Sequence, residues 1–541
     1  MTSRNQAIWG ETGQKLINDA KILITGLSIT GIEAIKTAAM LGIGTIYLVG
    51  DEQGSGFFLE QAMNPAKKQG KQLEKIVNDL RFKSGDLNTT VNVEAVEESY
   101  LNNDRLIKQL NPDAIFDFTQ DLSSQLQSIE YGIQLSAEKP VEVFLGGCNA
   151  QDFTLTHYSP SENDDAEDIA DEKEIDRYEG KDQDVTTSHI LSSIAIEFFR
   201  KRLFNRHKEI ISASQKDIKK PHKERGPFRD TLKYSIKHPQ ASQNIKQQHT
   251  NCLRTSMTQE DFSIGCHDAA ENLITTLNLD DLPNINTSLE GKTFLVCGCG
   301  AIGNPVADML VRKGAAKIDF MDFDKIKLHN AERQPFYCNR AKEYKAEVLS
   351  EKIKKIAEQM GNSIKSTAYI GKVCEKIEQG QEKQAFDQAW FSKNRYDIIL
   401  GCFDSAIARD TLNDYAAKIG FTYADAGSST ISSKATVFVP GETACLDCTA
   451  NIKFSAEDEK EDKEYWEQQT CGNPQAITPN VNMSNRIAAA LMVSEATQYL
   501  NSESENQFSG KITYFNEGTS FKVIITEPEC DLCKNDDTDK Q

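Results

Sequence analysis

Long apolar runs are missing from this chain of 541 residues, and none approaches the roughly 18 residues that a membrane-spanning helix needs. The first residues, MTSRNQAIWGETGQ, are polar and show no signal-peptide pattern. We therefore expect a cytoplasmic protein with no membrane partner.

An excess of basic charge is also missing, because 61 Lys and Arg stand against 81 Asp and Glu, for a formal net charge of -20. An acidic chain repels phosphate backbones, which argues against a nucleic-acid partner. The 13 cysteines are odd in number and scattered. This fits a reducing cytosol better than a disulfide scaffold.

The P-loop motif GxxxxGK[ST] does not occur, but a different glycine-containing pattern occurs twice. Residues 21–52 contain an apolar run ending in Gly, a helical segment and a second apolar run ending in an acid, and residues 292–324 repeat this order. Each unit predicts a strand, a turn, a helix and a strand. The repeat is of domain size, so we predict an α/β protein with two tandem Rossmann-like domains.

The two repeats differ in their glycine motifs. The second contains GCGAIG, with Gly298, Gly300 and Gly303, whereas the first contains GLSITG, with Ser28 at the middle position. Only glycine at the middle position lets the backbone approach a phosphate closely. The second repeat is therefore the better candidate for a nucleotide site, and the first is degenerate.

Polar residues after the second glycine motif distinguish between nucleotide classes. A GxGxxG motif alone also fits an NAD or FAD dehydrogenase, and an acid after the second strand would bind a ribose in either case. Several donors then follow in a short stretch, and clustered cations suit a triphosphate better than a nicotinamide. The candidate residues are Asp322 or Asp324 for the ribose, and Asn330, Arg333, Gln334 and Lys345 for the phosphates.

A further acid follows the segment YDIILG, which predicts a buried strand. Asp404 stands at the end of this strand, and a helix carrying Arg409 comes next. An acid at the carboxyl end of a strand in the same crevice is placed to bind Mg²⁺. The alternative is that Asp404 caps the helix.

Two CxxC pairs, CLDC and CDLC, predict one metal site. Cys445, Cys448, Cys530 and Cys533 would form a closed tetrahedral zinc site that joins distant segments. Such a site supports structure rather than catalysis, because no coordination position stays open. The alternative is a redox pair, but no thioredoxin pattern surrounds either CxxC.

Cys471 lies in EQQTCGNPQAITP, between a polar run and an Ala-rich apolar segment that predicts a helix. A buried spare thiol is not expected in polar, turn-forming sequence, and the four-cysteine set is complete without it. A thiol just before a helix N-terminus has its pKa lowered from about 8.5, because the helix end favours the thiolate. Cys471 is therefore the candidate nucleophile.

The chain resembles the E1-type activating enzymes of ubiquitin-like proteins, including the ThiF and MoeB adenylyltransferases of thiamine and molybdopterin biosynthesis, and the resemblance spans both repeats and most of the chain. The resemblance lies in GCGAIG, DFD, NAERQ, FDSAIAR, YADAGSSTISSKATVFVPGETACLDC and CDLC. RNQAIWG is similar to the start of the inactive half of eukaryotic E1s. The segment around Cys471, EQQTCGNPQAITPNVNMSNRIAAALMVSEATQYL, resembles the catalytic-cysteine loop of autophagy-type, non-canonical E1s.

The resemblance implies a chemistry and a set of partners. ATP and Mg²⁺ would bind in the second half, the C-terminal carboxylate of a β-grasp ubiquitin-like protein would attack the α-phosphate, and the acyl group would pass to Cys471 and then to an E2-like conjugating enzyme. Cofactors would be ATP, Mg²⁺ and Zn²⁺. Carried over residue by residue, the nucleotide and catalytic positions are Arg4 (reaching across from the inactive half), Gly298, Gly300, Gly303, Asp322, Asn330, Arg333, Lys345 and Asp404.

Two features depart from the family pattern. Glu332 stands where the family usually has Asn, which puts the phosphate contacts there in doubt. We also expect no separate cysteine domain and no C-terminal ubiquitin-fold domain, so the resemblance does not explain how a conjugating enzyme is recruited.

We predict three regions along the chain. Residues 1–206 form an inactive adenylation domain with an acidic insertion at 161–184, residues 207–254 a polar and basic connector, and residues 255–541 the active domain with the cysteine loop and zinc site. The pair would form a pseudo-dimeric monomer, with a homodimer also open. Two alternatives remain. One is an adenylyltransferase for a sulfur-carrier protein, and the other is a pseudoenzyme, stabilised by zinc, that binds a β-grasp protein without catalysing a reaction.

Overall fold

The computed structural model of the chain describes most of the elements of both repeats. The described residues are 6–26, 29–49, 91–96, 100–148, 152–160, 184–207, 253–255, 273–278, 289–327, 330, 333–337, 340–360, 362–374, 384–429, 432–450, 482–501, 510–515, 520–526, 528, 530 and 532–533. None of the helices among them is both long enough and apolar enough to cross a membrane.

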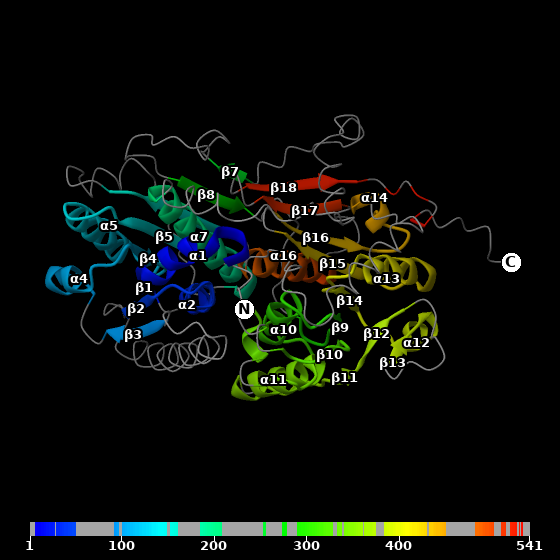
Figure 1. Cartoon of the computed structure of the whole chain (residues 1–541). Helices are drawn as coiled ribbons and strands as arrows, with labels where there is room; N and C mark the ends of the chain where they lie inside the picture. Colours follow the sequence, from blue (N-terminus) through cyan, green and yellow to red (C-terminus); the bar gives the residue numbers. More distant parts are fainter. Residues whose placement is uncertain are drawn as a thin grey trace.

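The half of the chain that contains the first repeat, called the first repeat from here on, folds into a sheet of eight strands in the order β3-β2-β1-β4-β5-β6-β8-β7 (Figure 1). The neighbours β3, β2, β1, β4 and β5 pair in parallel, and β6, β8 and β7 are added in antiparallel pairs. The parallel strands are mostly buried because helices cover both faces of such a sheet. The strands are β1 (Lys21–Thr25), β2 (Thr45–Val49), β3 (Asn92–Val96), β4 (Ala114–Asp117), β5 (Glu142–Cys148), β6 (Asp152–Tyr158), β7 (Leu253–Thr255) and β8 (Leu273–Asn278).

The second repeat has the same architecture, in the order β11-β10-β9-β14-β15-β16-β17-β18. Strands β11 to β15 are parallel, and β16, β17 and β18 are added antiparallel. A separate parallel pair is formed by β12 (Gly371–Val373) and β13 (Gln384–Phe386). The large sheet contains β9 (Thr293–Cys297), β10 (Lys317–Met321), β11 (Ala368–Tyr369), β14 (Ile398–Gly401), β15 (Tyr423–Ser428), β16 (Ser432–Phe438), β17 (Gly510–Phe515) and β18 (Ser520–Ile525).

The helices begin and end at the signals that the sequence provides. The Asp184 carboxylate accepts backbone N–H bonds at the start of α7, and Gly420, in the left-handed region, ends α13. The helices are α1 (Gln6–Asp19), α2 (Ile29–Leu41), α4 (Asp104–Leu110), α5 (Leu122–Ser136), α7 (Val185–Arg206), α10 (Gly303–Arg312), α11 (Lys345–Gln359), α12 (Gln388–Lys393), α13 (Ala406–Ile419), α14 (Leu446–Ala450) and α16 (Asn482–Asn501), with the 3-10 turn η5 (Pro335–Tyr337).

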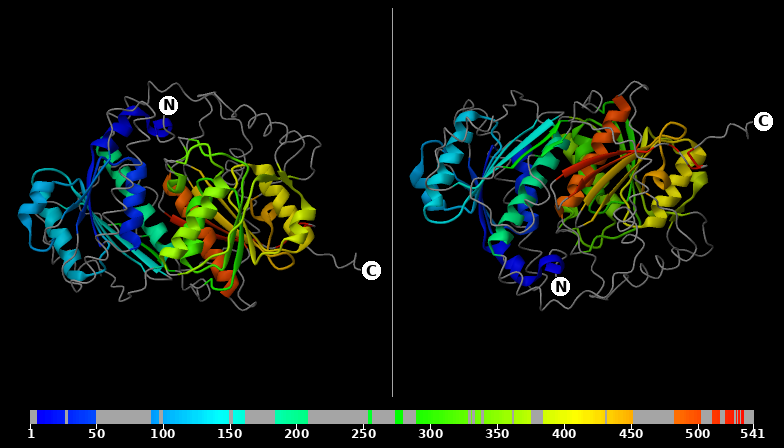
Figure 2. Two further views of the ribbon diagram at one scale, coloured as in Figure 1. Left: turned by 90° about the horizontal axis from the view of Figure 1, so that it is seen from below. Right: turned by 90° about the horizontal axis from the view of Figure 1, so that it is seen from above.

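Two helices lie at the centre of the molecule, where the repeats meet. Helix α7 packs on β5 and β6, α16 packs on β15 and β16, and the two helices pack against each other (Figures 1 and 2). Both are buried on nearly every side, as expected for helices enclosed between two sheets. Each repeat therefore supplies one wall of a shared core.

The predicted pair of tandem Rossmann-like sheets is confirmed. The Ala-rich segment after Cys471, which the sequence predicts to be helical, forms α16. The domain boundaries stay predictions, and β7 and β8 pair with the first sheet although β8 lies beyond residue 254. Most of the acidic insertion and of the connector lies outside the described residues.

Candidate nucleotide and zinc sites

The glycine motif of the second repeat lies where the strand order reverses, between β9 and β14, which is the usual ligand crevice of such sheets. Gly298 directly follows β9 and has φ +93°, and a Cβ there would lie 2.6 Å from the carbonyl oxygen of Cys402. A Cβ on Gly303 would lie 2.2 Å from the carbonyl oxygen of Gly298. The turn itself therefore requires glycine at these two positions.

Gly300, the middle glycine, has a different role. The position that its Cβ would take has no atom of the described chain within 4 Å, apart from its own neighbours in sequence. Glycine is therefore not needed here for the turn. Its missing side chain leaves open space beside the backbone, and a bound phosphate requires such space. In the first repeat the turn glycines are kept, with φ +72° at Gly26, while Ser28 lies outside the described residues.

Two aspartates and a lysine form a partly buried ionic group at the end of β10, in which Asp322 and Lys345 are buried and Asp324 is partly exposed. The Asp322 carboxylate accepts the backbone N–H groups of Cys299 and of Asp324, both at 2.7 Å. Lys345, the first residue of α11, places its Nζ 2.8 Å from Asp324 Oδ2. Burial raises the pKa of Asp322 to about 6, against the opposing effect of the Lys345 charge. The pKa of Lys345 is raised overall. Burial alone would lower it, but the negative charges of Asp322, Asp324 and Asp404 together have the larger effect.

Asp404 follows β14 by three residues and is exposed. It does not cap the next helix, because the N-cap of α13 is Ser405, whose hydroxyl accepts from the N–H of Ala408 at 3.3 Å. The Asp404 carboxylate lies close enough to Lys345 to affect its pKa. This leaves an exposed acid, with no capping duty, beside the ammonium group of the crevice.

Arg409 lies one turn into α13 and is buried. Its guanidinium donates to the Asp425 carboxylate and to the carbonyl oxygens of Phe403 and Ala426, the last at 2.8 Å. These contacts fix the loop that carries Asp404. Its prediction as a nucleotide ligand stays a prediction, and the contacts add a role in positioning.

The segment around η5 holds the other predicted phosphate residues, and all three described ones are buried. Asn330 Oδ1 accepts the backbone N–H of Lys327 at 2.8 Å, and the backbone N–H of Arg333 donates to the carbonyl of Asn330 at 3.2 Å. Gln334 Oε1 is buried without a hydrogen-bond partner among the described residues. These contacts hold Lys327, Asn330 and Arg333 close together.

Two residues that the sequence analysis missed connect this segment to the glycine loop. The Tyr337 hydroxyl donates to the carbonyl of Cys299, and Asn304 Oδ1 accepts the N–H of Phe336 at 3.1 Å. Asn304 Nδ2 is buried, and among the described residues the Tyr337 side chain is the one hydrogen-bonding neighbour recorded for it, so it is a candidate donor to a ligand. Its place directly after the GxGxxG motif is the signal that identifies it.

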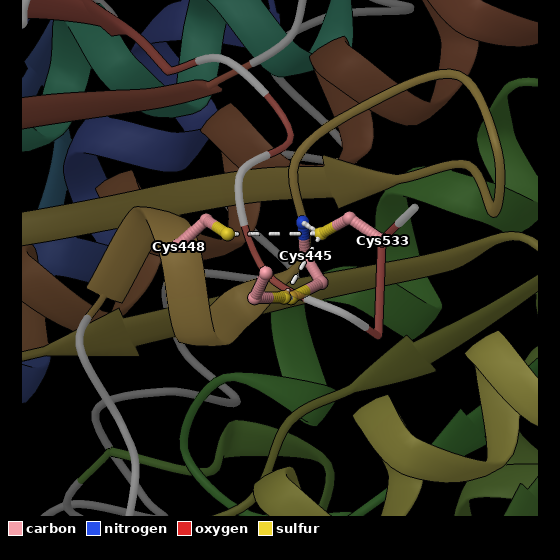
Figure 3. Close-up of side chains that lie close together, drawn as sticks. Cys445, Cys448 and Cys533 are labelled. Carbon is pink, nitrogen blue, oxygen red and sulfur yellow. Dashed lines mark hydrogen bonds between the residues drawn. The ribbon is translucent and has the colours of Figure 1, made fainter. Parts of the chain in front are cut away.

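The four CxxC cysteines converge, as predicted, on one point between the start of α14 and the tail. Figure 3 labels three of them, Cys445, Cys448 and Cys533. Their Sγ atoms are 3.4 Å apart for Cys445 and Cys530, 3.7 Å for Cys448 and Cys533, and 3.4 Å for Cys530 and Cys533. These separations are far longer than the ~2.05 Å of a disulfide. They are close to the ~3.8 Å between sulfurs around a tetrahedral zinc with Zn–S of about 2.3 Å.

The polar surroundings of this cluster favour a thiolate. Hydrogen bonding from the Cys533 thiol, against the opposing effect of burial, lowers the pKa of Cys445 to about 5, and backbone N–H groups add to this. Thiolates are the form that binds zinc. The hydrogen bond with Cys445 raises the pKa of Cys533, and burial raises the pKa of Cys530, so Cys445 is the thiol that these contacts favour as a thiolate. The donor set and the spacing fit a closed structural zinc site.

Three other cysteines lie in the core of the second repeat. Cys297, Cys299 and Cys402 are buried, and burial raises the pKa of each thiol. They therefore remain protonated packing residues. Arg4, Glu332 and Cys471 lie outside the described residues, so their predicted roles stay predictions.

Comparison with known proteins gives a family match over the second repeat. Residues 280–535 match the ThiF family. The chain is 28% identical over 176 residues to ubiquitin-like modifier-activating enzyme 5 of Xenopus laevis, covering 31% of this chain and 42% of the relative. For the Drosophila mojavensis enzyme of the same name the identity is 24% over 237 residues, covering 42% and 57%.

The chain thus spans between about two fifths and three fifths of the length of these curated relatives. Among solved structures, the crystal structure of Escherichia coli MccB with ATP matches with a TM-score of 0.34 and 20% identity. That match covers 45% of this chain and 67% of the other chain.

Proposed function

Because residues 280–535 form a ThiF-family domain, we propose that the chain is an ATP-dependent activating enzyme for a ubiquitin-like protein. The observation that carries the proposal is the crevice in which the open Gly300 position, the Asp322 carboxylate and the Lys345 ammonium group come together. The similarity to ubiquitin-like modifier-activating enzyme 5 supports the substrate class.

The nucleotide would bind along the glycine loop of the second repeat. Gly300 leaves room for a phosphate, and Asp322, as a carboxylate, would accept a hydrogen bond from a ribose hydroxyl. Lys345 and Arg333 would neutralise phosphate charge, with Asn330 and Gln334 as further polar contacts. Asp404 would hold Mg²⁺, which supplies charge neutralisation at the phosphates when it is bound.

The chemistry asks the chain to stabilise charge rather than to supply a base. A C-terminal carboxylate oxygen of the modifier would bond to the α-phosphorus while the bond to pyrophosphate breaks, leaving an acyl-adenylate. Arg333, Lys345 and, from the first repeat, Arg4 would carry the positive charge that favours this step. The Cys471 thiolate would then attack the acyl carbon, AMP would leave, and a thioester would remain for transfer to an E2-like enzyme.

The pKa of Asp322 predicts a pH dependence. Adenosine should bind more weakly as the pH falls through about 6, because protonation removes the acceptor for the ribose hydroxyl. Adenosine is the probe because phosphate groups of ATP titrate in the same range. The dissociation constant should rise several-fold from pH 7.5 to pH 5.5 in wild type and stay flat in Asp322→Asn, measured by calorimetry. A wild-type constant that is equally flat would contradict the role of this carboxylate.

The direct test of the proposal is ATP–pyrophosphate exchange with candidate β-grasp proteins, followed by a non-reducing gel. Cys471→Ala should keep exchange and lose the thiol-sensitive adduct, because the nucleotide residues and Cys471 belong to separate segments of the chain. Cys374→Ala, which removes a half-buried thiol outside the zinc cluster, is the control and should keep both. An adduct that survives in Cys471→Ala would show that another nucleophile is used.

The remaining outcomes decide between the alternatives. Exchange without any adduct in wild type would favour an adenylyltransferase for a sulfur-carrier protein. No exchange with any candidate would favour a scaffold without turnover.

A further inference from the structure

A buried ionic cluster lies between the two repeats, away from the nucleotide crevice. Glu33 and Lys36 come from α2, His189 from α7, Asp308 from α10 and Arg486 from α16, and all five are buried. Lys36 Nζ lies 2.6 Å from Glu33 Oε1 and 3.6 Å from Asp308 Oδ2. Arg486 donates to the Glu33 carboxylate and to His189 Nδ1, the latter at 2.9 Å. The cluster therefore joins the two halves with ion pairs that cross the interface.

The cluster contains metal-binding residue types, but its contacts assign it another role. Both Glu33 and Asp308 already pair with cations, and these hold the pKa of each carboxyl low although burial alone would raise it. His189 Nδ1 accepts from a guanidinium, so the ring proton is on Nε2, which then offers no lone pair to a metal. Asp308 also pairs with Arg312 of its own helix at 2.8 Å, so three cations hold the two carboxylates of the group.

The two residues that meet at 3.6 Å occupy equivalent positions in the repeats. In each glycine motif, a Cβ on the last glycine would press against the carbonyl oxygen of the first, at 2.3 Å in the first repeat and 2.2 Å in the second. The motifs therefore align, Gly31 with Gly303. Lys36 follows Gly31 by the same number of residues as Asp308 follows Gly303, in α2 and α10 respectively.

Contact between equivalent residues has a geometric consequence. Such residues meet only near the pseudo-twofold axis that relates the halves. If the catalytic half paired with a second copy of itself through the same face, Asp308 would meet Asp308. Two carboxylates would then face each other, each with Arg312 of its own helix as its remaining cation, which is costly, whereas Lys36 and Asp308 attract each other.

A second ion pair crosses the interface on one side. Lys313, at the C-terminal end of α10, pairs with Asp184, which caps the N-terminus of α7, and both side chains are buried. The residue of the first repeat that aligns with Lys313 is Leu41. The Lys313–Asp184 pair therefore exists on one side of the interface only. Two identical halves would not form the same set of ion pairs.

We propose that Lys36 and Asp308 determine which halves pair: they hold the degenerate half against the catalytic half and prevent self-pairing of the catalytic half through this face. Buried ion pairs are better attested in selecting a partner than in adding stability. The degenerate half is then the required partner of the catalytic half, in place of a second copy of this chain.

The first test is a charge-swap cycle in the full chain, followed by thermal unfolding. Lys36→Asp and Asp308→Lys should each lower the unfolding midpoint by roughly 5 °C or more, and the double variant should recover at least half of the summed loss. If a single reversal fails to fold, Lys36→Gln and Asp308→Asn complete a cycle with neutral side chains. If the decrease in the unfolding midpoint of the double variant equalled the sum of the two single decreases, the two side chains would not interact, and the proposal would be wrong.

The second test addresses self-pairing. A protease site inserted between Asn278 and Leu289 would let the folded chain be cut after purification, and native mass spectrometry would then report which fragments associate. Wild type should give only a pair of unlike fragments, whereas Asp308→Asn should also give dimers of the catalytic fragment. Equal dimer formation in wild type, or no dimers in either protein, would overturn Asp308 as the determinant.

Discussion

Asp404→Ala is expected to reduce ATP–pyrophosphate exchange by at least about 100-fold and to leave the thermal unfolding midpoint unchanged. Stability should be kept because the side chain is exposed and Ser405, not Asp404, caps α13. Exchange should fall because the charge on the leaving pyrophosphate would lose its Mg²⁺ ligand. The two measurements together separate a catalytic from a structural role.

Asp414→Ala is the matched control, since it removes a partly exposed aspartate from α13, the helix that follows Asp404. Asp414 pairs with Lys418 at 3.1 Å on the surface, a pair that contributes little to stability. Exchange in this variant should equal wild type. If Asp404→Ala also retained full exchange, the assignment of the metal ligand would be wrong, and Asp322 and Asp324 would be the next acids to test.

The parts of the site that the sequence predicted are those coded by short local motifs. The glycine motif fixes its own turn, because Gly298 and Gly303 meet backbone atoms at distances that no side chain tolerates. The CxxC pairs likewise specify ligands and spacing within four residues each. Even the degenerate character of the first motif follows from one residue, Ser28.

The parts that the sequence did not predict depend on contacts between distant segments. Arg409 was predicted as a nucleotide ligand, but a one-dimensional pattern does not show that its guanidinium meets Asp425 and two carbonyl oxygens. The pairing of Lys36 with Asp308 appears only once the two repeats are packed together. Similarly, β8 joins the first sheet by pairing with β6, across a long stretch of chain.

Loss of zinc is expected to have the largest effect on stability. Cys533→Ser should abolish stoichiometric zinc and lower the thermal unfolding midpoint by roughly 10 °C or more, because structural zinc contributes on the order of 10 kcal/mol in apparent binding. Cys533 is buried and its Sγ accepts the backbone N–H of Cys445 at 3.0 Å, so it joins the tail to the segment before α14.

Bound zinc is measured by elemental mass spectrometry, and unfolding by calorimetry, on protein purified without chelator. Cys374→Ser is the control, because that thiol lies outside the cluster and its loss should change neither reading. Incubating wild type with a strong chelator should reproduce the lowered midpoint of Cys533→Ser, and adding zinc should reverse it in wild type only. Wild-type protein that carries no zinc, or a Cys533→Ser variant that keeps both zinc and stability, would show that the four cysteines do not form a metal site.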